Sequence, residues 1–262
     1  MSVVTITTDF GTRDGYVGEV KGVLVTRAPE VALVDVAHDV TPGDVRGAAW
    51  ILGRIWGRFP IGTVHLAVVD PGVGGARTPI AARVAQRWFV GPDNGLLTLV
   101  CRAFPVEEAR RIDLAIDGRP PSSTFHGRDV FAPAAAHLST GADPEQIGPE
   151  IERDQIVALA LPRPTRQGDT LRGHVLHVDR FGNLITNLPN EDLPPSPQVL
   201  ISGVTLQTLS PSYDAVGAGE LLASLGSGGT VEIAVRDGSA SERLGVKRDE
   251  EVEVRPSPGG AA

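Results

Sequence analysis

Hydrophobic and polar positions follow two kinds of pattern in the N-terminal part of the chain. Short apolar runs rich in β-branched residues predict strands, and apolar residues three or four positions apart predict helices. The predicted strands are Val3–Thr7, Val31–Val36, Thr63–Val69, Pro79–Val84 and Trp88–Val90. The predicted helices are Tyr16–Arg27 and a segment that begins at an Asp44 cap and continues to Arg58. This alternation favours an α/β domain with a largely parallel central sheet over residues 1–162.

The pattern changes at Leu161–Gly168, a segment with two prolines that we interpret as a linker. Beyond it the apolar runs are short, and turn residues separate them. They predict strands at Leu171–Val178, Val199–Ile201, Thr230–Val235 and Glu251–Val254. We therefore expect a smaller antiparallel β-barrel-like domain over residues 169–256. A frayed tail is expected from Pro256 to Ala262.

Composition narrows the function classes. The 262 residues carry a formal net charge of -8 and one cysteine. An acidic chain without a basic run is a poor candidate for binding nucleic acid or an anionic membrane, so we expect neither partner. No apolar stretch reaches the ~20 residues that span a bilayer. One cysteine allows no intrachain disulfide, and the start of the chain lacks a signal-peptide pattern, so we expect a cytoplasmic protein.

Candidate chemistry lies where predicted strands end. Thr8–Gly11 follows the first strand, Asp70–Gly74 follows the third with Arg77 shortly after, and Phe125–Asp129 lies in a predicted loop before an apolar helical segment. In open α/β sheets this edge binds ligands. Any one of these aspartates alone is more often a turn or cap residue.

Two common nucleotide-binding patterns do not fit the chain. The glycines lack the Lys-Ser/Thr of a P-loop and the spacing of a dinucleotide-binding fingerprint. Asp9-Phe10-Gly11 has the letters of the kinase magnesium motif, but no His-Arg-Asp loop or glycine-rich loop precedes it. We exclude both interpretations.

Taken together, five segments are far more specific than any one of them. They are Thr8–Gly11 with Asp14–Gly18, Val68–Gly74 with Arg77, Gly91–Gly95, Phe125–Asp129 and Asp179–Asn183. In these segments and their order the chain resembles, over nearly its whole length, the S-adenosylmethionine (SAM) hydroxide adenosyltransferases, which are hydrolase relatives of fluorinase and chlorinase. The resemblance implies hydrolysis of SAM to adenosine and methionine, with no metal or other cofactor.

The resemblance also implies a catalytic trio of Asp70, Arg77 and His126. Water must attack the ribose C5′ in line and displace methionine, a neutral thioether that needs no general acid. A carboxylate and an imidazole can each accept the proton of the water, and a guanidinium favours its hydroxide form. The sequence leaves open which of Asp70 and His126 is the acceptor.

Substrate-binding roles follow from the same resemblance. It implies that Asp9, helped by Asp14, binds the ribose hydroxyls and that Asp179 meets the methionine ammonium group. The adenine and carboxylate contacts it implies are Phe181, Asn183 and Ser227. Each of these three has an ordinary alternative: core packing for Phe181, a turn for Asn183 and a glycine-rich loop for Ser227.

Departures from the fluorinase pattern favour water as the nucleophile. The halide-binding serine of fluorinase corresponds to Gly127, and its tyrosine and threonine near the reacting carbon correspond to Asp70 and Val73. Its tryptophan over the adenosine corresponds to Gly43, and its insertion is absent from the short Arg83–Gly91 segment. A carboxylate at position 70 would repel a halide ion.

Three other functions remain as alternatives: halide-dependent adenosyl transfer, a calcium-dependent nucleoside hydrolase, and a SAM sensor without activity. The calcium alternative lacks the adjacent pair of aspartates that such a site favours. The resemblance further implies a homotrimer with active sites at subunit interfaces. The predicted site residues are compatible with that, since Asp9, Asp70, Arg77 and His126 precede the proline-rich segment and the adenine and methionine residues follow it.

Overall fold

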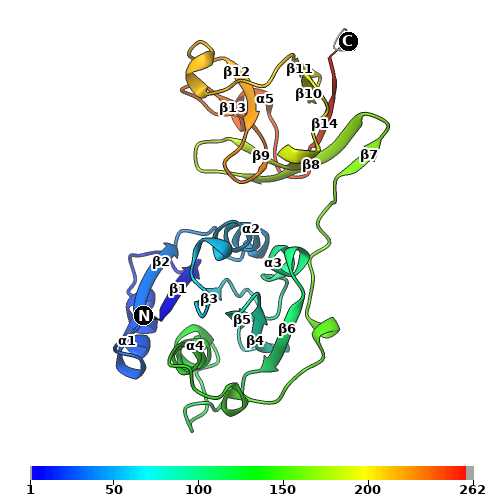
Figure 1. Cartoon of the computed structure of the whole chain (residues 1–262). Helices are drawn as coiled ribbons and strands as arrows, with labels where there is room; N and C mark the ends of the chain where they lie inside the picture. The colour runs from blue at the N-terminus through cyan, green and yellow to red at the C-terminus, as the bar shows by residue number, and fades with distance from the viewer. Residues whose placement is uncertain (1, 258–262) are drawn as a thin grey trace. The chain divides into compact units, whose positions relative to one another are not determined.

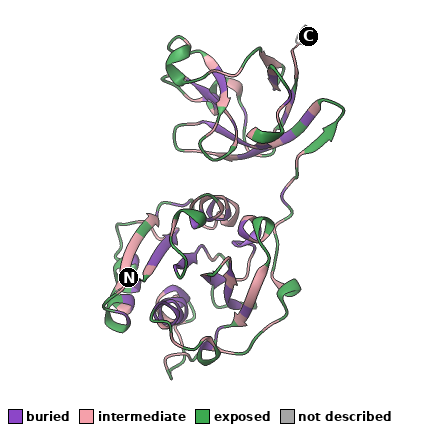
Figure 2. Ribbon diagram, viewed as in Figure 1, coloured by how far each residue is buried: buried purple, intermediate pink, exposed green. Residues whose placement is uncertain are grey.

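The chain forms two compact units, each with its own core. The structure is a computed structural model that describes residues 2–257, and it divides into Met1–Leu159 and Ala160–Ala262. Two buried clusters lie in the first unit and one in the second, as the purple segments in Figure 2 illustrate. The division falls just before the segment where the apolar pattern of the sequence changes.

A six-stranded sheet forms the centre of the N-terminal unit, in the order β2-β1-β3-β5-β4-β6 (Figure 1). Its strands are β1 (Val3–Thr8), β2 (Ala32–Ala37), β3 (Val64–Val68), β4 (Pro79–Val84), β5 (Arg87–Pro92) and β6 (Val106–Arg111). The pairs of β1 with β2 and β3, and of β3 with β5, are parallel. Strand β4 is antiparallel to β5 and β6. The predicted α/β class with a largely parallel sheet is confirmed.

Helices cover both faces of this sheet. They are α1 (Tyr16–Arg27), α2 (Val45–Ile55), α3 (Thr98–Ala103) and α4 (Ala132–Ser139). In β3, Leu66 and Val68 pack in one cluster with α1 and α4, while Ala67, and Val69 directly after the strand, pack in the other with α2 and α3. Since successive side chains of a strand point to opposite faces, this alternation makes three layers.

Two helical segments differ from the sequence prediction. Asp44 caps α2 as predicted, with its Oδ1 accepting from the Gly47 N–H at 3.0 Å, but the α-helix ends at Ile55 and a 3₁₀ turn continues to Arg58. The predicted loop over Phe125–Asp129 is wrong in its second half, because Gly127–Phe131 forms a π-helix that leads directly into α4. π-Helical turns are rare and often occur at functional sites.

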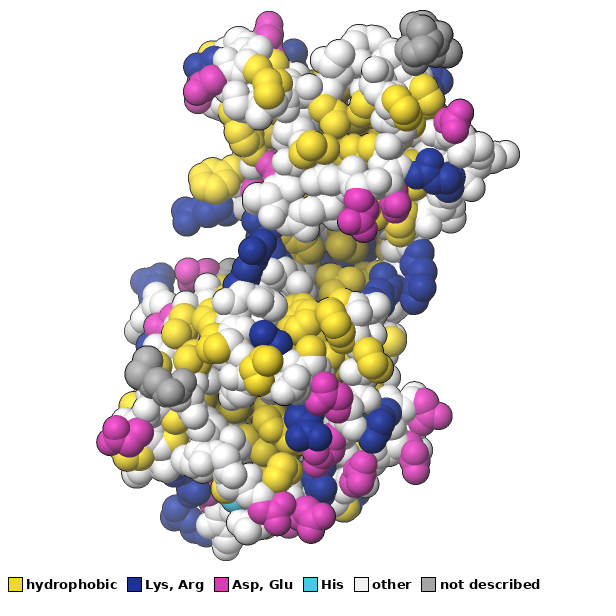
Figure 3. All heavy atoms as spheres, viewed as in Figure 1, with side chains coloured by type: hydrophobic (Ala, Val, Ile, Leu, Met, Phe, Trp, Pro, Cys, Tyr) yellow, Lys and Arg dark blue, Asp and Glu magenta, His cyan; other side chains and the backbone are white. Residues whose placement is uncertain are grey.

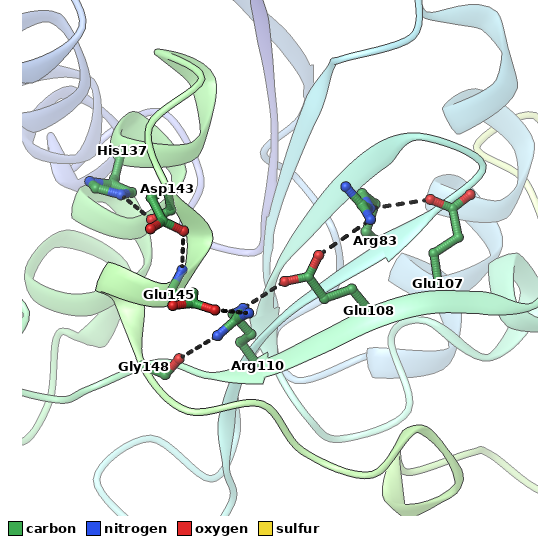
Figure 4. A network of polar contacts seen from close by, with 8 residues as sticks. All are labelled: Arg83, Glu107, Glu108, Arg110, His137, Asp143, Glu145 and Gly148. Carbon is green, nitrogen blue, oxygen red and sulfur yellow. Dashed lines mark hydrogen bonds and ion pairs between the residues drawn. The ribbon is translucent and has the colours of Figure 1, made fainter.

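Strand β6 is absent from the sequence prediction because most of its side chains are charged. Figure 4 shows its residues in an ion-pair network with β4 and the turn after α4. The Arg110 guanidinium lies 2.6 Å from Glu108 and donates to the Gly148 carbonyl at 3.2 Å, and Arg83 lies 3.4 Å from Glu108. Charged side chains on an edge strand discourage pairing with another chain. Because they occupy most positions of β6, the strand lacks the alternation of apolar and polar residues by which strands are predicted.

The C-terminal unit is an antiparallel, nearly closed, barrel-like sheet, as predicted. Its order is β11-β10-β14-β8-β9-β13-β12, with β7 paired to β8. The strands are β7 (Thr165–Gln167), β8 (Thr170–Val178), β9 (Leu184–Pro189), β10 (Pro197–Ile201), β11 (Val204–Leu206), β12 (Leu221–Leu225), β13 (Thr230–Val235) and β14 (Glu251–Pro256), with helix α5 at Ala240–Leu244. Apolar residues from both ends of this order fill one core.

The structure differs from the sequence prediction at both ends of this unit. The second half of the predicted linker is strand β7, which turns at Gly168 (φ +58°) to pair with β8. Left-handed backbone at a glycine permits this tight hairpin. The predicted tail begins too early, since Pro256 ends β14 and the Ser257 N–H donates to the Ser196 carbonyl at 2.9 Å. The rest of the predicted tail, residues 258–262, lies outside the described residues.

The surface carries charges of both signs. On the part of the described surface that Figure 3 presents, basic and acidic side chains are interspersed rather than gathered in one basic face. Across residues 2–257, no helix has the length and apolar character needed to cross a bilayer. In an open α/β sheet such as that of the N-terminal unit, ligands bind beyond the carboxyl ends of the strands.

Candidate active site

Arg77 contacts both Asp70 and His126 in the N-terminal unit. The Arg77 Nε donates to both Asp70 carboxylate oxygens, at 3.0 and 2.8 Å, and Arg77 Nη2 lies 2.7 Å from His126 Nδ1. The exposed fractions of the Asp70 and Arg77 side chains are 5% and 10%, and that of His126 is 5%. Segments separated in sequence thus bring together the residues that the sequence predicted as a trio.

The arrangement fixes the protonation of His126. Burial, with the Arg77 charge second, lowers the pKa of His126 below its usual 6.5, although Asp70 and Asp129 act in the opposite direction. A guanidinium only donates hydrogen bonds, so the neutral ring accepts from it at Nδ1 and carries its own proton on Nε2. The guanidinium also packs on an aromatic ring, since Arg77 Cζ lies 5.4 Å from the centre of the Phe131 ring.

Close backbone approach joins the loops of the trio. Gly74 has φ +74°, and a Cβ there would lie 2.3 Å from the Ser123 carbonyl oxygen, which real atoms do not tolerate. Asn94, from the Gly91–Gly95 segment, donates from Nδ2 to the Val69 carbonyl at 2.9 Å, directly before Asp70. The sequence motif gave this segment no role, and the structure shows it supporting the loop that carries Asp70.

The loop after β1 carries Asp9, which is half-buried. Its Oδ2 accepts from the Gly43 N–H at 2.8 Å, and the Gly11 N–H donates to the His38 carbonyl at 2.8 Å. His38 is not among the site residues predicted from the sequence, although it is a polar residue shortly after a predicted strand. Asp14 is exposed in the turn before α1.

An aromatic cluster connects the Asp9 loop to the His126 loop. The Phe125 ring lies edge-on to Phe10 and to Tyr16, with ring centroids 5.7 and 5.4 Å apart. A Cβ on Gly127 would lie 3.0 Å from Phe10 Cζ, so this cluster fills the space next to Gly127. The site has no room for a side chain at that position unless the Phe10 ring moves.

Arg128 and Asp129 anchor the His126 loop. Arg128 pairs with Asp129 at 2.6 Å and with Glu19 of α1 at 2.8 Å, and the Asp129 Oδ2 accepts from the Ser122 N–H at 2.9 Å. The hydrogen bond from Arg128, together with that backbone contact, outweighs burial and lowers the pKa of Asp129. Arg128 and Asp129 therefore fix the loop of His126 against α1.

In the C-terminal unit, Asp179, Phe181 and Asn183 share the turn between β8 and β9. Asp179 Oδ1 accepts from the backbone N–H groups of Phe181 and Asn183 at 2.9 and 3.0 Å, and its Oδ2 accepts from Asn183 Nδ2 at 3.0 Å. Asn183 is buried, while the Phe181 side chain is 70% exposed, which contradicts core packing for this residue. An exposed ring near a buried amide can stack and hydrogen-bond with a flat heterocycle.

Ser227 lies apart from this turn. It is exposed in the turn between β12 and β13. That turn is held at the far end of β9, where the Asn190 N–H donates to the Gly229 carbonyl at 2.9 Å. The 179–183 turn lies at the beginning of β9, so the structure brings together three of the four residues predicted in this unit and leaves Ser227 at the other end of the strand.

The positions of the His, Cys, Asp and Glu side chains show whether they could bind a metal ion together. Among residues 2–257, no group of three or more His, Cys, Asp and Glu side chains is arranged to hold a metal ion. The carboxylate of Asp70 is engaged by Arg77, and that of Asp179 by its own turn. These contacts suit the carboxylates to hydrogen bonding with a polar organic molecule.

Comparison with known proteins finds relatives that match most of this chain. A protein of Thermus thermophilus named (R)-S-adenosyl-L-methionine hydrolase is 46% identical, over 94% of this chain and 97% of its own length. A fluorinase of Actinoplanes sp. is 31% identical over 73% of each chain. The crystal structure of an uncharacterized conserved protein from Thermotoga maritima matches with a TM-score of 0.88 and 36% identity, over 96% of this chain and 99% of that one.

Two family models cover most of the sequence. The SAM hydroxide adenosyltransferase N-terminal domain matches residues 4–148, and the corresponding C-terminal domain matches residues 173–253. The first range contains the Asp70–Arg77–His126 cluster and the second contains the 179–183 turn. This chain therefore belongs to the SAM hydroxide adenosyltransferase family.

Proposed function

We propose that this protein hydrolyses S-adenosyl-L-methionine to adenosine and L-methionine. Membership of the family and the names of its relatives support the substrate and the reaction. The observation that carries the proposal is the buried cluster of Asp70, Arg77 and His126, which joins a carboxylate, a guanidinium and a neutral imidazole. That set of groups can orient a water molecule and take up its proton.

The bond changes are simple. The water oxygen attacks C5′ of the ribose, the C5′–S bond breaks, and its electron pair stays on sulfur as the neutral thioether of methionine. The sulfonium loses its positive charge in this step, so no general acid is needed. The one proton to be removed comes from the attacking water, and a neighbouring base must accept it.

Asp70 is the proton acceptor in this proposal. The lone pair of His126 Nδ1 is occupied by Arg77, and Nε2 carries a proton, so the neutral ring donates a hydrogen bond rather than accepting one. Asp70 Oδ2 accepts from both Nε and Nη2 of Arg77, whereas Oδ1 accepts from Nε at 3.0 Å and keeps a second acceptor site for the water. The guanidinium favours negative charge on the water as the proton leaves.

Binding roles are proposed on each unit. The Asp9 carboxylate accepts one hydrogen bond from the Gly43 N–H and uses its other acceptor sites for the ribose hydroxyls. Asp14, which follows the same loop, assists in binding these hydroxyls. Phe181 stacks on adenine, and Asn183 offers Oδ1 to it because its amide nitrogen already faces Asp179 and Tyr213, at 3.0 and 3.4 Å. The ammonium contact of Asp179 and the carboxylate contact of Ser227 rest on the resemblance alone.

A halide as nucleophile is less well supported. Phe10 fills the space beside Gly127, where the halide-binding serine of fluorinase would lie. The carboxylate at position 70 would also repel an anion close to the reacting carbon. We therefore assign water as the nucleophile of this chain.

We further propose a cytoplasmic enzyme that needs no metal or other cofactor, so EDTA should leave its turnover unchanged. The proposed assembly is a homotrimer with active sites at subunit interfaces. Light scattering tests the trimer, and mixing Asp70→Ala with Asn183→Ala subunits tests shared sites. Activity returns only if some sites combine two intact halves, and a mixture as inactive as its parents contradicts sharing.

Product analysis tests the reaction itself. Purified protein is incubated with SAM, and the nucleosides and amino acids are separated by chromatography. Equimolar adenosine and methionine are expected. Methylthioadenosine with homoserine lactone, or intact substrate after long incubation with excess protein, would contradict the proposal, and the second result would favour a sensor.

A further inference from the structure

A chain of hydrogen bonds runs from the Asp9 loop to the surface of α1. Thr8 Oγ1 lies 2.9 Å from His38 Nδ1, and His38 Nε2 lies 3.0 Å from Asp35 Oδ1. The other carboxylate oxygen of Asp35 accepts from Lys21 Nζ at 2.6 Å. None of the four residues belongs to the catalytic trio or to the predicted binding residues.

The hydrogen-bonded series of the Thr8 hydroxyl, the His38 imidazole and the Asp35 carboxylate is not a nucleophilic triad. Thr8 has an exposed fraction of 0% and His38 of 8%, so a substrate carbonyl or phosphorus could not reach the Thr8 oxygen. A nucleophile needs a reacting atom about 3 Å away in line with it. The chain of contacts must therefore act on structure rather than on a substrate directly.

The donors and acceptors of this chain form one consistent order. The Asp35 carboxylate can only accept, so His38 Nε2 donates to it, and a ring with its one proton there accepts at Nδ1 from the Thr8 hydroxyl. Thr8 Oγ1 in turn is 3.4 Å from the donating Phe10 N–H. Hydrogen bonds aligned in this way polarise one another in a buried setting.

The same histidine also holds the loop through its backbone. The His38 carbonyl accepts from the Gly11 N–H at 2.8 Å, while the Thr8 hydroxyl is bound by its ring. Residue 38 therefore ties both ends of the four-residue loop that carries Asp9. The Asp9 carboxylate, fixed on one side by the Gly43 N–H, has its remaining acceptor sites aimed by this loop.

We propose that His38 is a positioning residue for Asp9, which it holds, through Thr8 and its own carbonyl, in the orientation that binds the ribose hydroxyls. This inference rests on the proposed function, because it assigns Asp9 to those hydroxyls. Asp35 and Lys21 steady the ring from outside. Their side chains are 46% and 34% exposed, so this outer pair adds less than the buried Thr8 contact.

The test separates affinity from turnover. His38→Ala removes the ring, and Thr8→Val removes the hydroxyl with little change in shape. Each variant should raise the KM for SAM about tenfold, the loss expected for a hydrogen bond that orders a charged group, with kcat within about twofold. His38→Asn places Oδ1 near the position of Nδ1 and should restore most of the affinity.

The link to Asp9 is tested by a double-mutant cycle. In an Asp9→Ala background, Thr8→Val and His38→Ala should no longer change KM, because the group that they position is absent. His137→Ala is the matched control, since it also removes an imidazole together with its hydrogen bond, here one to the Asp143 carbonyl at 2.8 Å (Figure 4), but lies outside the site. It should leave KM unchanged.

Each outcome has a separate meaning. A wild-type KM for folded Thr8→Val and His38→Ala overturns the positioning role, as does a rise in KM that persists in full without Asp9. If His38→Ala does not fold, Thr8→Val and His38→Asn decide the question. If the wild-type protein releases no adenosine from SAM, the proposed function fails instead, and that failure is visible before any variant is compared.

Discussion

Arg77 Nη2 and His126 Nδ1 lie 2.7 Å apart although the two residues are 49 positions apart in the sequence. The guanidinium has no lone pair to offer, so the contact exists as a hydrogen bond only while the imidazole is neutral at Nδ1. Protonation of His126 would put two cations in contact. Much of the behaviour expected of this site follows from that relationship.

The first prediction concerns pH. Burial and Arg77 lower the pKa of His126 below 6.5, so the ring stays neutral and the Arg77 contact persists at that pH. We expect turnover to be kept down to pH values below 6.5. NMR titration of the His126 ring should give a midpoint below 6.5, and Arg77→Gln should raise that midpoint by removing a nearby positive charge.

The free energy of unfolding should also depend on the protonation of His126, and it should decrease as the pH falls. As pH falls through 6.5, the unfolded chain takes up a proton that folded His126 resists, so the free energy of unfolding decreases until the folded ring is protonated too. His126→Gln should show less of this loss, measured by urea unfolding at about pH 7 and about pH 5.5. A His126 midpoint above 6.5 would contradict the assignment of its tautomer.

The second prediction separates chemistry from binding. Asp70→Ala should lower kcat by roughly 10²–10⁴-fold, as expected when general-base catalysis is lost. Arg77→Ala and His126→Ala should also lower kcat, because these residues orient Asp70 and the attacking water. Asp9→Ala should mainly raise KM, since its carboxylate is assigned to the ribose and not to the water. Steady-state kinetics with SAM checks both, and near wild-type turnover in both Arg77→Ala and His126→Ala would exclude the trio.

The third prediction concerns the approach of the two loops at Gly74. Alanine there adds a Cβ 2.3 Å from the Ser123 carbonyl oxygen, on a backbone with φ +74°, so the loops of Arg77 and His126 must separate. We expect turnover to fall at least about 10²-fold, because small misplacements at a site have such effects. Gly22→Ala in α1 is the control, as a Cβ there meets no atom within 4 Å. Equal activity of the two variants would contradict the prediction.

The fourth prediction concerns nucleophile choice. Wild-type protein with added chloride or fluoride should form no 5′-halo-adenosine, because Phe10 fills the space beside Gly127. Gly127→Ser should lower turnover without producing halide transfer, since its Cβ would press on the Phe10 ring at 3.0 Å. Mass spectrometry of the nucleoside products measures both, and a halogenated nucleoside from the wild-type protein would assign it to the other branch of the family.

Patterns in the sequence predicted the fold where a continuous apolar run marks a buried strand or a capping residue marks the start of a helix. The buried strands β1 and β3 and the Asp44 cap of α2 are examples. The pattern failed where charge or tertiary contact decides the conformation. Strand β6 has charged side chains at an edge, and the π-helix at Gly127–Phe131 has buried residues at Gly127, Val130 and Phe131, but no local pattern that predicts it.

The site was predictable as a set of residues but not as an arrangement. The motifs select Asp70, Arg77 and His126, yet no spacing in the sequence indicates that Arg77 bridges the other two. The contact of His38 with Thr8 was also hidden, because a histidine after a strand has no pattern of its own. Both contacts join residues far apart in the sequence, so no local spacing indicates them.

Isotope labelling tests most directly whether water is the nucleophile at C5′. The protein is incubated with SAM in ¹⁸O-labelled water without added metal, and the adenosine is analysed by mass spectrometry with fragmentation of its ribose. Attack by water at C5′ should place one ¹⁸O atom in the 5′-hydroxyl and none in methionine. Adenosine without label at the 5′ position, or label found only in the amino-acid product, would contradict it.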